Sequence, residues 1–293
     1  MNKKPFNSLN DYFVRYFFTD KGGEKVLLDF INAVMISANM KTFKSVEILN
    51  PFNLKKNYND KETIVDVKCI TKNGTVVIIE VQLSGNSRFP ERILYYWSTN
   101  YSKLLKKGKG YEDLTPVISI NLLNFNLNKK DSNVHSCYMI YDTKNKRLLT
   151  DNLQIHIIEL KKFNFKNNNL SKDLNYWLGF FTTKNMEEYM SEIVKEKPIM
   201  EEAHKRYNNF IRSRLMMSEY EKKEIYQYDK QIMLKDERRE GIKEGMKKGK
   251  LEGLKEGRIA GQISMAKSMK TKNLDINLIS EITGLTIDEI KKL

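Results

Sequence analysis

The feature that most constrains this chain is a pair of strand-like segments joined by a short polar loop. Residues 63–71 and 75–83 are rich in Val, Ile and Thr, which favour strands, and the Lys-Asn-Gly sequence of residues 72–74 lies between them. This arrangement predicts an antiparallel hairpin. The length of the loop decides which residues of the two strands face each other, and a slip of one residue would move every side chain to the other face.

The register matters because each segment carries one acidic residue among apolar neighbours. Asp66 and Glu80 interrupt segments that otherwise resemble buried strands, where an unpaired carboxylate is costly. A two-residue turn would set residue 66 opposite residue 81 and place the acids on opposite faces. A three-residue loop, with Gly74 in the left-handed conformation and a bulge, sets Asp66 directly across from Glu80. It also makes the other face apolar, with Val65, Val67 and Cys69 opposite Val81, Ile79 and Val77. We therefore expect the three-residue loop.

Two carboxylates that face each other favour a bound cation. Like charges at such positions destabilise a hairpin unless a cation neutralises them. Magnesium suits one or two carboxylates together with waters and phosphate, and no His or Cys cluster in the sequence suits zinc. Gln82, two residues after Glu80 on the same face, can donate a hydrogen bond to a phosphate oxygen. The alternative is that Asp66 and Glu80 are ordinary polar residues of an edge strand that face solvent.

The rest of the pattern predicts an α/β fold in which helices flank a mixed β-sheet. Apolar residues at helical spacing predict helices within residues 10–36, divided at Gly22-Gly23, and over residues 88–107, ended by Gly108. Further strands are expected at residues 43–49, 116–125, 134–141 and 153–160.

We divide the chain into an α/β domain and a C-terminal helical extension. The parts are residues 1–185, a charged helical region 186–240, a Glu/Gly repeat 241–270 and a helical hairpin 271–293, in which Thr286 and Glu289 form a capping box. Nothing beyond about residue 185 needs to belong to the catalytic core. The repeat has glycine at every fourth position, at Gly241, Gly245, Gly249, Gly253, Gly257 and Gly261. Glycine inside a helix costs about 1 kcal/mol, so this segment is either a helix that packs against a partner, giving a homo-oligomer, or a frayed charged tail.

Composition narrows the class of partner. The chain has 293 residues, a formal net charge of +14 and only two cysteines. The charge suits a polyanion such as nucleic acid, although it also suits a merely solvated surface. Cys69 and Cys137 are too few for a disulfide framework, and no apolar run is long enough to cross a membrane. We therefore expect a soluble cytoplasmic protein without a membrane partner.

Several short motifs together resemble one family. They are Asp66, Ile79-Glu80-Val81-Gln82, Arg92 with Tyr95-Tyr96, Leu104 to Gly108, Tyr111, Pro116-Val117-Ile118, Asp11-Tyr12-Phe13, Ile155 to Leu160 and the Glu/Gly repeat. In this order they resemble the Rpn family of recombination-promoting nucleases, also described as transposases, within the PD-(D/E)XK nuclease superfamily. The resemblance covers most of the chain and implies a restriction-endonuclease-like core.

The resemblance also implies roles for individual residues. Asp66 and Glu80 would hold Mg²⁺ or another divalent metal, and Gln82 stands where the superfamily usually has Lys, which reduces the electrostatic stabilisation available there. Asp11 loosely matches a helical acid near such sites. The implied reaction is hydrolysis of a phosphodiester in double-stranded DNA, with a metal that activates water and with Gln82 orienting the nucleophile.

The helix after the hairpin supplies candidate contacts to nucleic acid. Arg92, Tyr96, Thr99 and Lys103 fall on one helical face, and Lys68 is a candidate to replace the missing positive charge. Tyr96 as a core residue and Lys103 as a solvated lysine remain alternatives. We expect an endonuclease that promotes recombination. The alternative is a catalytically weak or inactive DNA-binding accessory protein of a mobile element, and no separate DDE triad supports a strand-joining transposase.

Overall fold

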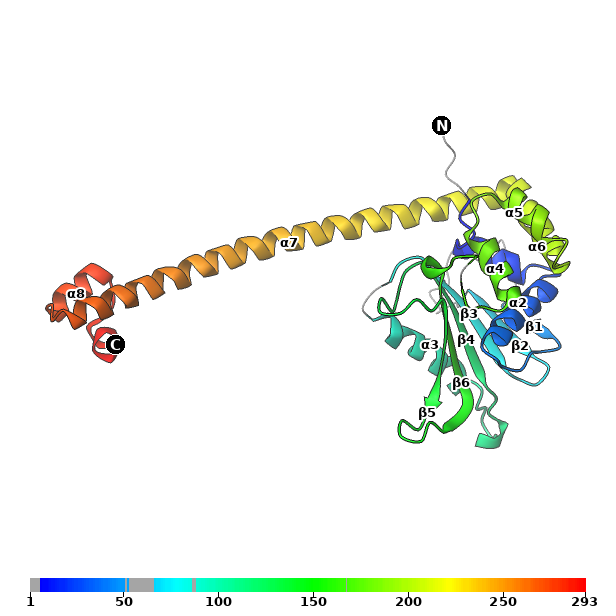
Figure 1. Ribbon diagram of the computed structural model, residues 1–293, viewed down its shortest axis with the longest axis horizontal. Helices are drawn as coiled ribbons and strands as arrows, with labels where there is room; N and C mark the ends of the chain where they lie inside the picture. Colours follow the sequence, from blue (N-terminus) through cyan, green and yellow to red (C-terminus); the bar gives the residue numbers. More distant parts are fainter. Residues whose placement is uncertain (1–5, 51, 53–65, 86–87, 167) are drawn as a thin grey trace. The chain divides into compact units, whose positions relative to one another are not determined.

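A mixed β-sheet is the main element of the first part of the chain (Figure 1). The computed structural model describes residues 6–50, 52, 66–85, 88–166 and 168–293. Within them the sheet has six strands in the order β1-β2-β3-β4-β6-β5. They are β1 (Val46–Ile48), β2 (Val67–Thr71), β3 (Val76–Gln82), β4 (Val117–Leu123), β5 (His135–Tyr141) and β6 (Leu148–Glu159). The first three strands pair antiparallel, β3, β4 and β6 pair in parallel, and β5 is antiparallel to β6. The predicted α/β fold is confirmed.

The hairpin of β2 and β3 has the three-residue loop. Val67 lies opposite Ile79, which is the register that this loop requires. Gly74 has a φ of +82°, a conformation that L side chains rarely adopt. The prediction of a left-handed Gly74 is confirmed, and the two-residue turn is excluded. The first part of the expected strand, residues 63–65 with Val65, lies outside the described residues.

Different helices cover the two faces of the sheet (Figure 1). The helices on the first face include α1 (Asp11–Thr19), α2 (Glu24–Ser37) and α4 (Lys172–Thr182), which share the main apolar core with Val67 and Ile79. On the second face, α3 (Phe89–Ser102) packs Trp97 against Ile78. Because side chains alternate along β3, Glu80 lies on the α3 face with Ile78. The predicted division of residues 10–36 into two helices at Gly22-Gly23 is also confirmed.

Helices beyond residue 185 pack into the same core. They are α5 (Met186–Ile193), α6 (Ile199–Arg212) and the first turns of α7 (Arg214–Thr271). Phe210 and Tyr220 belong to the main apolar cluster. Arg206 is buried and donates hydrogen bonds to four carbonyls at the C-terminal end of α1, those of Tyr16, Phe17, Asp20 and Lys21. The chain accordingly divides into compact units at residues 1–224 and 225–293.

The second unit is helical. Besides the remainder of α7 it contains α8 (Ile276–Thr283) and α9 (Ile287–Lys292), which pack around Ala266. The predicted capping box of Thr286 and Glu289 is present at the start of α9. All six glycines of the repeat lie within α7, and an added Cβ at any of them would meet nothing within 4 Å. Across the described part of the chain, no helix combines the length and apolar character needed to span a membrane.

Candidate active site

Asp66 and Glu80 meet at the open end of the β2–β3 hairpin. Glu80 is a buried residue of β3, and the half-buried Asp66 directly precedes β2. The Oδ2 atom of Asp66 accepts a hydrogen bond from the backbone N–H of Val81 at 2.7 Å, and the backbone N–H of Asp66 donates to the Glu80 carboxylate. The hairpin register and these two contacts bring the predicted acids together.

Burial and mutual repulsion disfavour the ionised forms of both acids. Burial raises the pKa of Glu80 to about 9, and the nearby charge of Asp66 adds to this rise. Burial likewise raises the pKa of Asp66 to about 7, against the hydrogen bond from Val81, which lowers it. Two ionised carboxylates at this position therefore require a positive charge beside them.

One carboxylate oxygen of the Asp66 and Glu80 pair is free to bind a further group. The Oε1 atom of Glu80 is buried and has no hydrogen-bond partner among the described residues. A buried carboxylate oxygen without a partner is costly, and an oxygen-preferring divalent cation would satisfy it. No group of three or more His, Cys, Asp or Glu side chains among the residues described is arranged to hold a metal. The candidate ligands at this place are accordingly the two carboxylates of Asp66 and Glu80, and carboxylate oxygens are donors that hard divalent cations prefer.

Three other predicted residues lie around the acids. The Gln82 side chain donates a hydrogen bond to Glu80, and the positive charge of Arg92 also favours ionised Glu80. Asp11, the first residue of α1, is close enough for its charge to raise the pKa of Asp66. Charged residues at the start of α3 and at the start of α1 therefore act on the acids of the hairpin.

The remaining predicted contacts lie elsewhere along the hairpin and α3. Burial lowers the pKa of Lys68, and the charge of Lys103 lowers it further, so these two lysines are neighbours. Lys103 is the C-cap of α3 rather than part of its face, because the helix ends at Ser102 and not at residue 107 as expected. The ring of Tyr96 packs beside that of Tyr95, with centroids 6.2 Å apart.

Two basic residues near the acids were missed by the sequence analysis. The charges of Arg15 and Lys223 both lower the pKa of Asp66. Arg15 follows Asp11 by four residues and so shares its helix face, a signal that the sequence does contain. Lys223 lies on α7, far from Asp66 in sequence, and no local pattern connects them.

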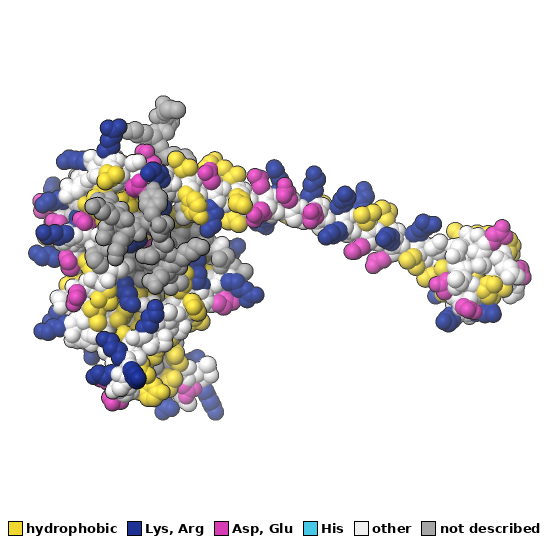
Figure 2. All heavy atoms as spheres, turned by 180° about the vertical axis from the view of Figure 1, so that it is seen from behind, with side chains coloured by type: hydrophobic (Ala, Val, Ile, Leu, Met, Phe, Trp, Pro, Cys, Tyr) yellow, Lys and Arg dark blue, Asp and Glu magenta, His cyan; other side chains and the backbone are white. Residues whose placement is uncertain are grey.

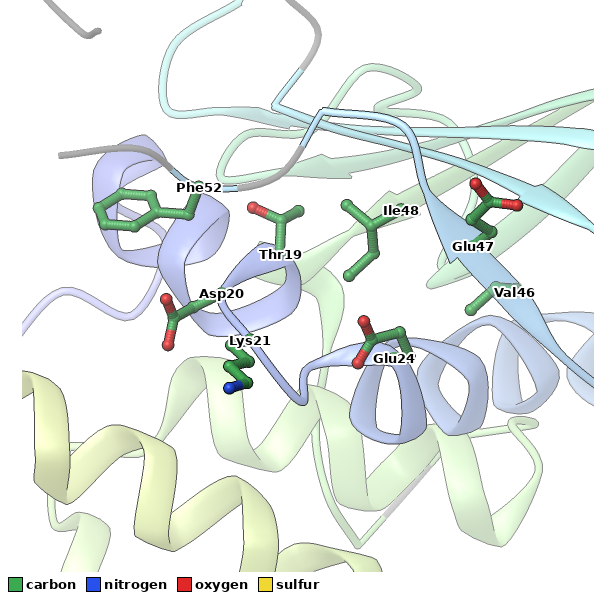
Figure 3. A pocket seen from close by; sticks show the side chains of 8 residues that line it. All are labelled: Thr19, Asp20, Lys21, Glu24, Val46, Glu47, Ile48 and Phe52. Carbon is green, nitrogen blue, oxygen red and sulfur yellow. The ribbon is translucent and has the colours of Figure 1, made fainter. Parts of the chain in front are cut away.

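A recess in this unit lies at a different place from the acids. It has a volume of about 430 Å³ and lies between the end of α1, the start of α2 and β1 (Figure 3). Its lining residues are Thr19, Asp20, Lys21, Glu24, Val46, Glu47, Ile48 and Phe52. Three carboxylates against one lysine make this recess a poor site for a polyanion. On the face seen in Figure 2, Lys and Arg side chains are spread over the sheet-containing unit and interspersed with Asp and Glu.

Comparison with known proteins identifies the family. A family described as PD-(D/E)XK nuclease family transposase matches residues 8–237, which include every residue of the candidate site. No match was found to a curated protein or to a solved structure. The mixed sheet with flanking helices agrees with the fold of such nucleases. The chain therefore belongs to the PD-(D/E)XK nuclease family of transposases.

Proposed function

We propose that this protein is a metal-dependent DNA endonuclease that hydrolyses phosphodiester bonds and promotes DNA recombination. The observation that carries the proposal is the buried, unpartnered Oε1 atom of Glu80 beside Asp66. Nucleases of the PD-(D/E)XK class generally use divalent metals, and the match to that family supports nuclease chemistry. Double-stranded DNA is the substrate that the net charge of +14 and the family favour.

In this proposal Asp66 and Glu80 are the metal ligands. When bound, a divalent cation would neutralise phosphate charge and activate water for attack. The hydrogen bond from Val81 holds Asp66 at the start of β2, and the hydrogen bond from Gln82 orients Glu80. The side-chain amide of Gln82 has two N–H donors. One can bind Glu80 while the other positions the attacking water. Asp11 would act on Asp66 through its charge.

Nucleic acid would approach along the α3 side of the hairpin. Arg92 is the best supported contact, because its charge already acts on Glu80. Lys68 and Lys103 form a second pair of positive charges that would bind the phosphate backbone. Tyr96, half-buried on α3, is the least supported contact of the four.

We also propose that the chain forms a homo-oligomer through the glycine repeat of α7. Six glycines inside a helix are unfavourable by roughly 5 to 6 kcal/mol in total, unless close packing of another helix offsets them. All six offer open space at the Cβ position within the described structure. A second copy of the chain is the partner expected to fill it.

The test is cleavage of supercoiled plasmid by the purified full-length protein with Mg²⁺ or Mn²⁺. We expect nicking by wild type and at least a 100-fold loss for Asp66→Asn and Glu80→Gln. Glu47→Gln, which neutralises an acid of the recess on β1, is the matched control and should cleave normally. If Asp66→Asn and Glu80→Gln cleave as well as wild type, the site is wrong.

The alternative is a DNA-binding accessory protein with little or no catalytic activity. Gln82 in place of the usual lysine favours it, because that position lacks a cation for the developing charge. Salt-sensitive DNA binding without cleavage in any divalent metal would establish this alternative. An increase in recombination between marked plasmids in cells, lost with Asp66→Asn, would support the nuclease.

A further inference from the structure

The first turns of α7 are fastened to the start of the chain and of α1. The ring of Tyr220 stacks on Phe6 with centroids 4.7 Å apart, and its hydroxyl accepts a hydrogen bond from the backbone of Asn7 at 2.7 Å. One turn later, the Oε1 atom of Glu224 accepts from the side-chain amides of Asn7 and Asn10, at 3.1 and 2.7 Å. Asn10 is itself the N-cap of α1. This part of α7 is therefore held in register with the start of α1.

Lys223 lies between these two anchors and pairs with Asp11, the acid at the start of α1. Its Nζ atom is 3.3 Å from the Oδ2 atom of Asp11, and its charge also acts on Asp66. The Lys223 side chain is 45% exposed and that of Asp11 is 37% exposed. The ammonium group is thus close to the acids and still open to an incoming ligand.

We propose that Lys223 binds the phosphate at the candidate active site and supplies the positive charge that Gln82 does not. This inference rests on the proposed nuclease function. An ammonium group has three donors, so it can keep its contact with Asp11 and also bind a phosphate oxygen. An exposed ion pair such as Lys223 and Asp11 contributes little to stability. Stability of this pair alone therefore does not explain why the α7 turn that carries Lys223 is anchored at both Tyr220 and Glu224.

Other basic residues fit this role less well. Lys68, the candidate from the sequence, is next to Lys103 and partly desolvated. Arg15 acts on Asp66 as Lys223 does, but its Nε atom is buried. Arg92 acts on Glu80 from the α3 side. Lys223 therefore combines proximity to Asp66 with access from solvent.

The experiment compares three variants of the full-length protein. Lys223→Gln removes the charge, Lys223→Arg retains it, and Lys222→Gln removes a charge from the neighbouring residue, which pairs with Glu219 along the same helix at 2.6 Å. Turnover on saturating duplex DNA is measured with Mg²⁺. Duplex binding is measured with Ca²⁺ over a range of salt concentrations, and the melting temperature is measured for each variant.

We expect Lys223→Gln to lower turnover by about 10- to 100-fold, because it removes one electrostatic contact to the reacting phosphate. The slope of log K against log salt should become shallower by about 0.9, the value for one phosphate contact on duplex DNA. Lys223→Arg should restore both quantities in large part. Lys222→Gln should match wild type, and all melting temperatures should be similar.

Two results would overturn the role of Lys223 while leaving the nuclease proposal intact. They are turnover within 2-fold of wild type for Lys223→Gln, or equal losses for Lys223→Gln and Lys222→Gln, in each case with Asp66→Asn inactive. If wild type fails to cleave DNA with every divalent metal tested, the nuclease proposal fails instead. In that case the salt dependence of duplex binding still tests the contact between Lys223 and a DNA phosphate. An equal slope of log K against log salt for Lys223→Gln and wild type would reject that contact.

Discussion

The Oδ2 atom of Asp66 accepts a hydrogen bond from the backbone N–H of Val81 at 2.7 Å. This contact links the first acid of the site to the strand that carries the second. The position of Asp66 therefore depends on the register of β2 against β3, which the loop at Gly74 sets.

Replacement of Gly74 should destabilise the hairpin. At a φ of +82°, Gly74→Ala costs about 1 to 2 kcal/mol of strain. The added Cβ would also lie 2.9 Å from Cγ2 of Thr115, a steric conflict. Urea denaturation measures the loss. Gly108→Ala is the control, because Gly108 has the same φ with nothing within 4 Å of the added Cβ. Equal losses for both variants would show that Thr115 moves aside freely.

The metal-free protein should lose stability as the pH rises. Because the pKa of Glu80 is raised to about 9 and that of Asp66 to about 7, the folded state holds protons that the unfolded state has released. The stabilisation is complete below the unfolded pKa values, near 4, and is lost as the pH rises through 7 and 9. Melting temperatures in EDTA should therefore fall from pH 5 to pH 9 less steeply for Glu80→Gln than for wild type. Added Mg²⁺ should restore stability at pH 8 in wild type only. Parallel pH curves for the two proteins would contradict this.

Two neighbouring histidines, the half-buried His135 and the buried His156, should give the opposite trend. The Nε2 atom of His135 lies 3.0 Å from Nδ1 of His156, and burial lowers the pKa of His135 to about 4 and that of His156 to about 3. Their contribution to the free energy of unfolding is complete above the pKa of histidine in the unfolded chain, near 6.5. It is lost as the pH falls toward 4. We expect His135→Phe to flatten the fall in melting temperature between pH 6.5 and pH 4.5. A fall as steep as in wild type would show that other groups cause it.

Bulky residues in the glycine repeat should weaken self-association. Gly245→Leu and Gly249→Leu place a large side chain where close helix packing is proposed, yet both favour the helix itself. The molar mass from light scattering should fall for the double variant. Lys247→Leu, which adds a large side chain on another side of α7, is the control and should leave the mass unchanged. A monomeric wild type at micromolar concentration would refute the oligomer.

The parts of the fold set by local chemistry could be predicted from the sequence. The hairpin register followed from strand alternation together with the glycine required at position 74, and the contact of Asp66 with Glu80 followed from that register. Arg92 could be placed on the helix that follows, although its effect on Glu80 could not.

Long-range packing could not be predicted in this way. Strand β6 begins at Leu148 rather than near residue 153, because its exposed first part is held by pairing with β5, as at Ile140 and Thr150. That part lacks the apolar alternation that marks a strand. Lys223 reaches Asp11 only because Tyr220 and Glu224 dock on the other end of the chain, and no periodicity within α7 reports such a contact.

The four hydrogen bonds from Arg206 to the end of α1 determine where this protein can be divided. A protease cut or a gene fusion after residue 185 would leave those carbonyls without their donor and would remove Phe210 and Tyr220 from the core. The compact unit that contains the sheet therefore includes the helices up to residue 224. A division of the chain after residue 224 would leave these hydrogen bonds and this apolar packing intact, whereas one after residue 185 would remove both.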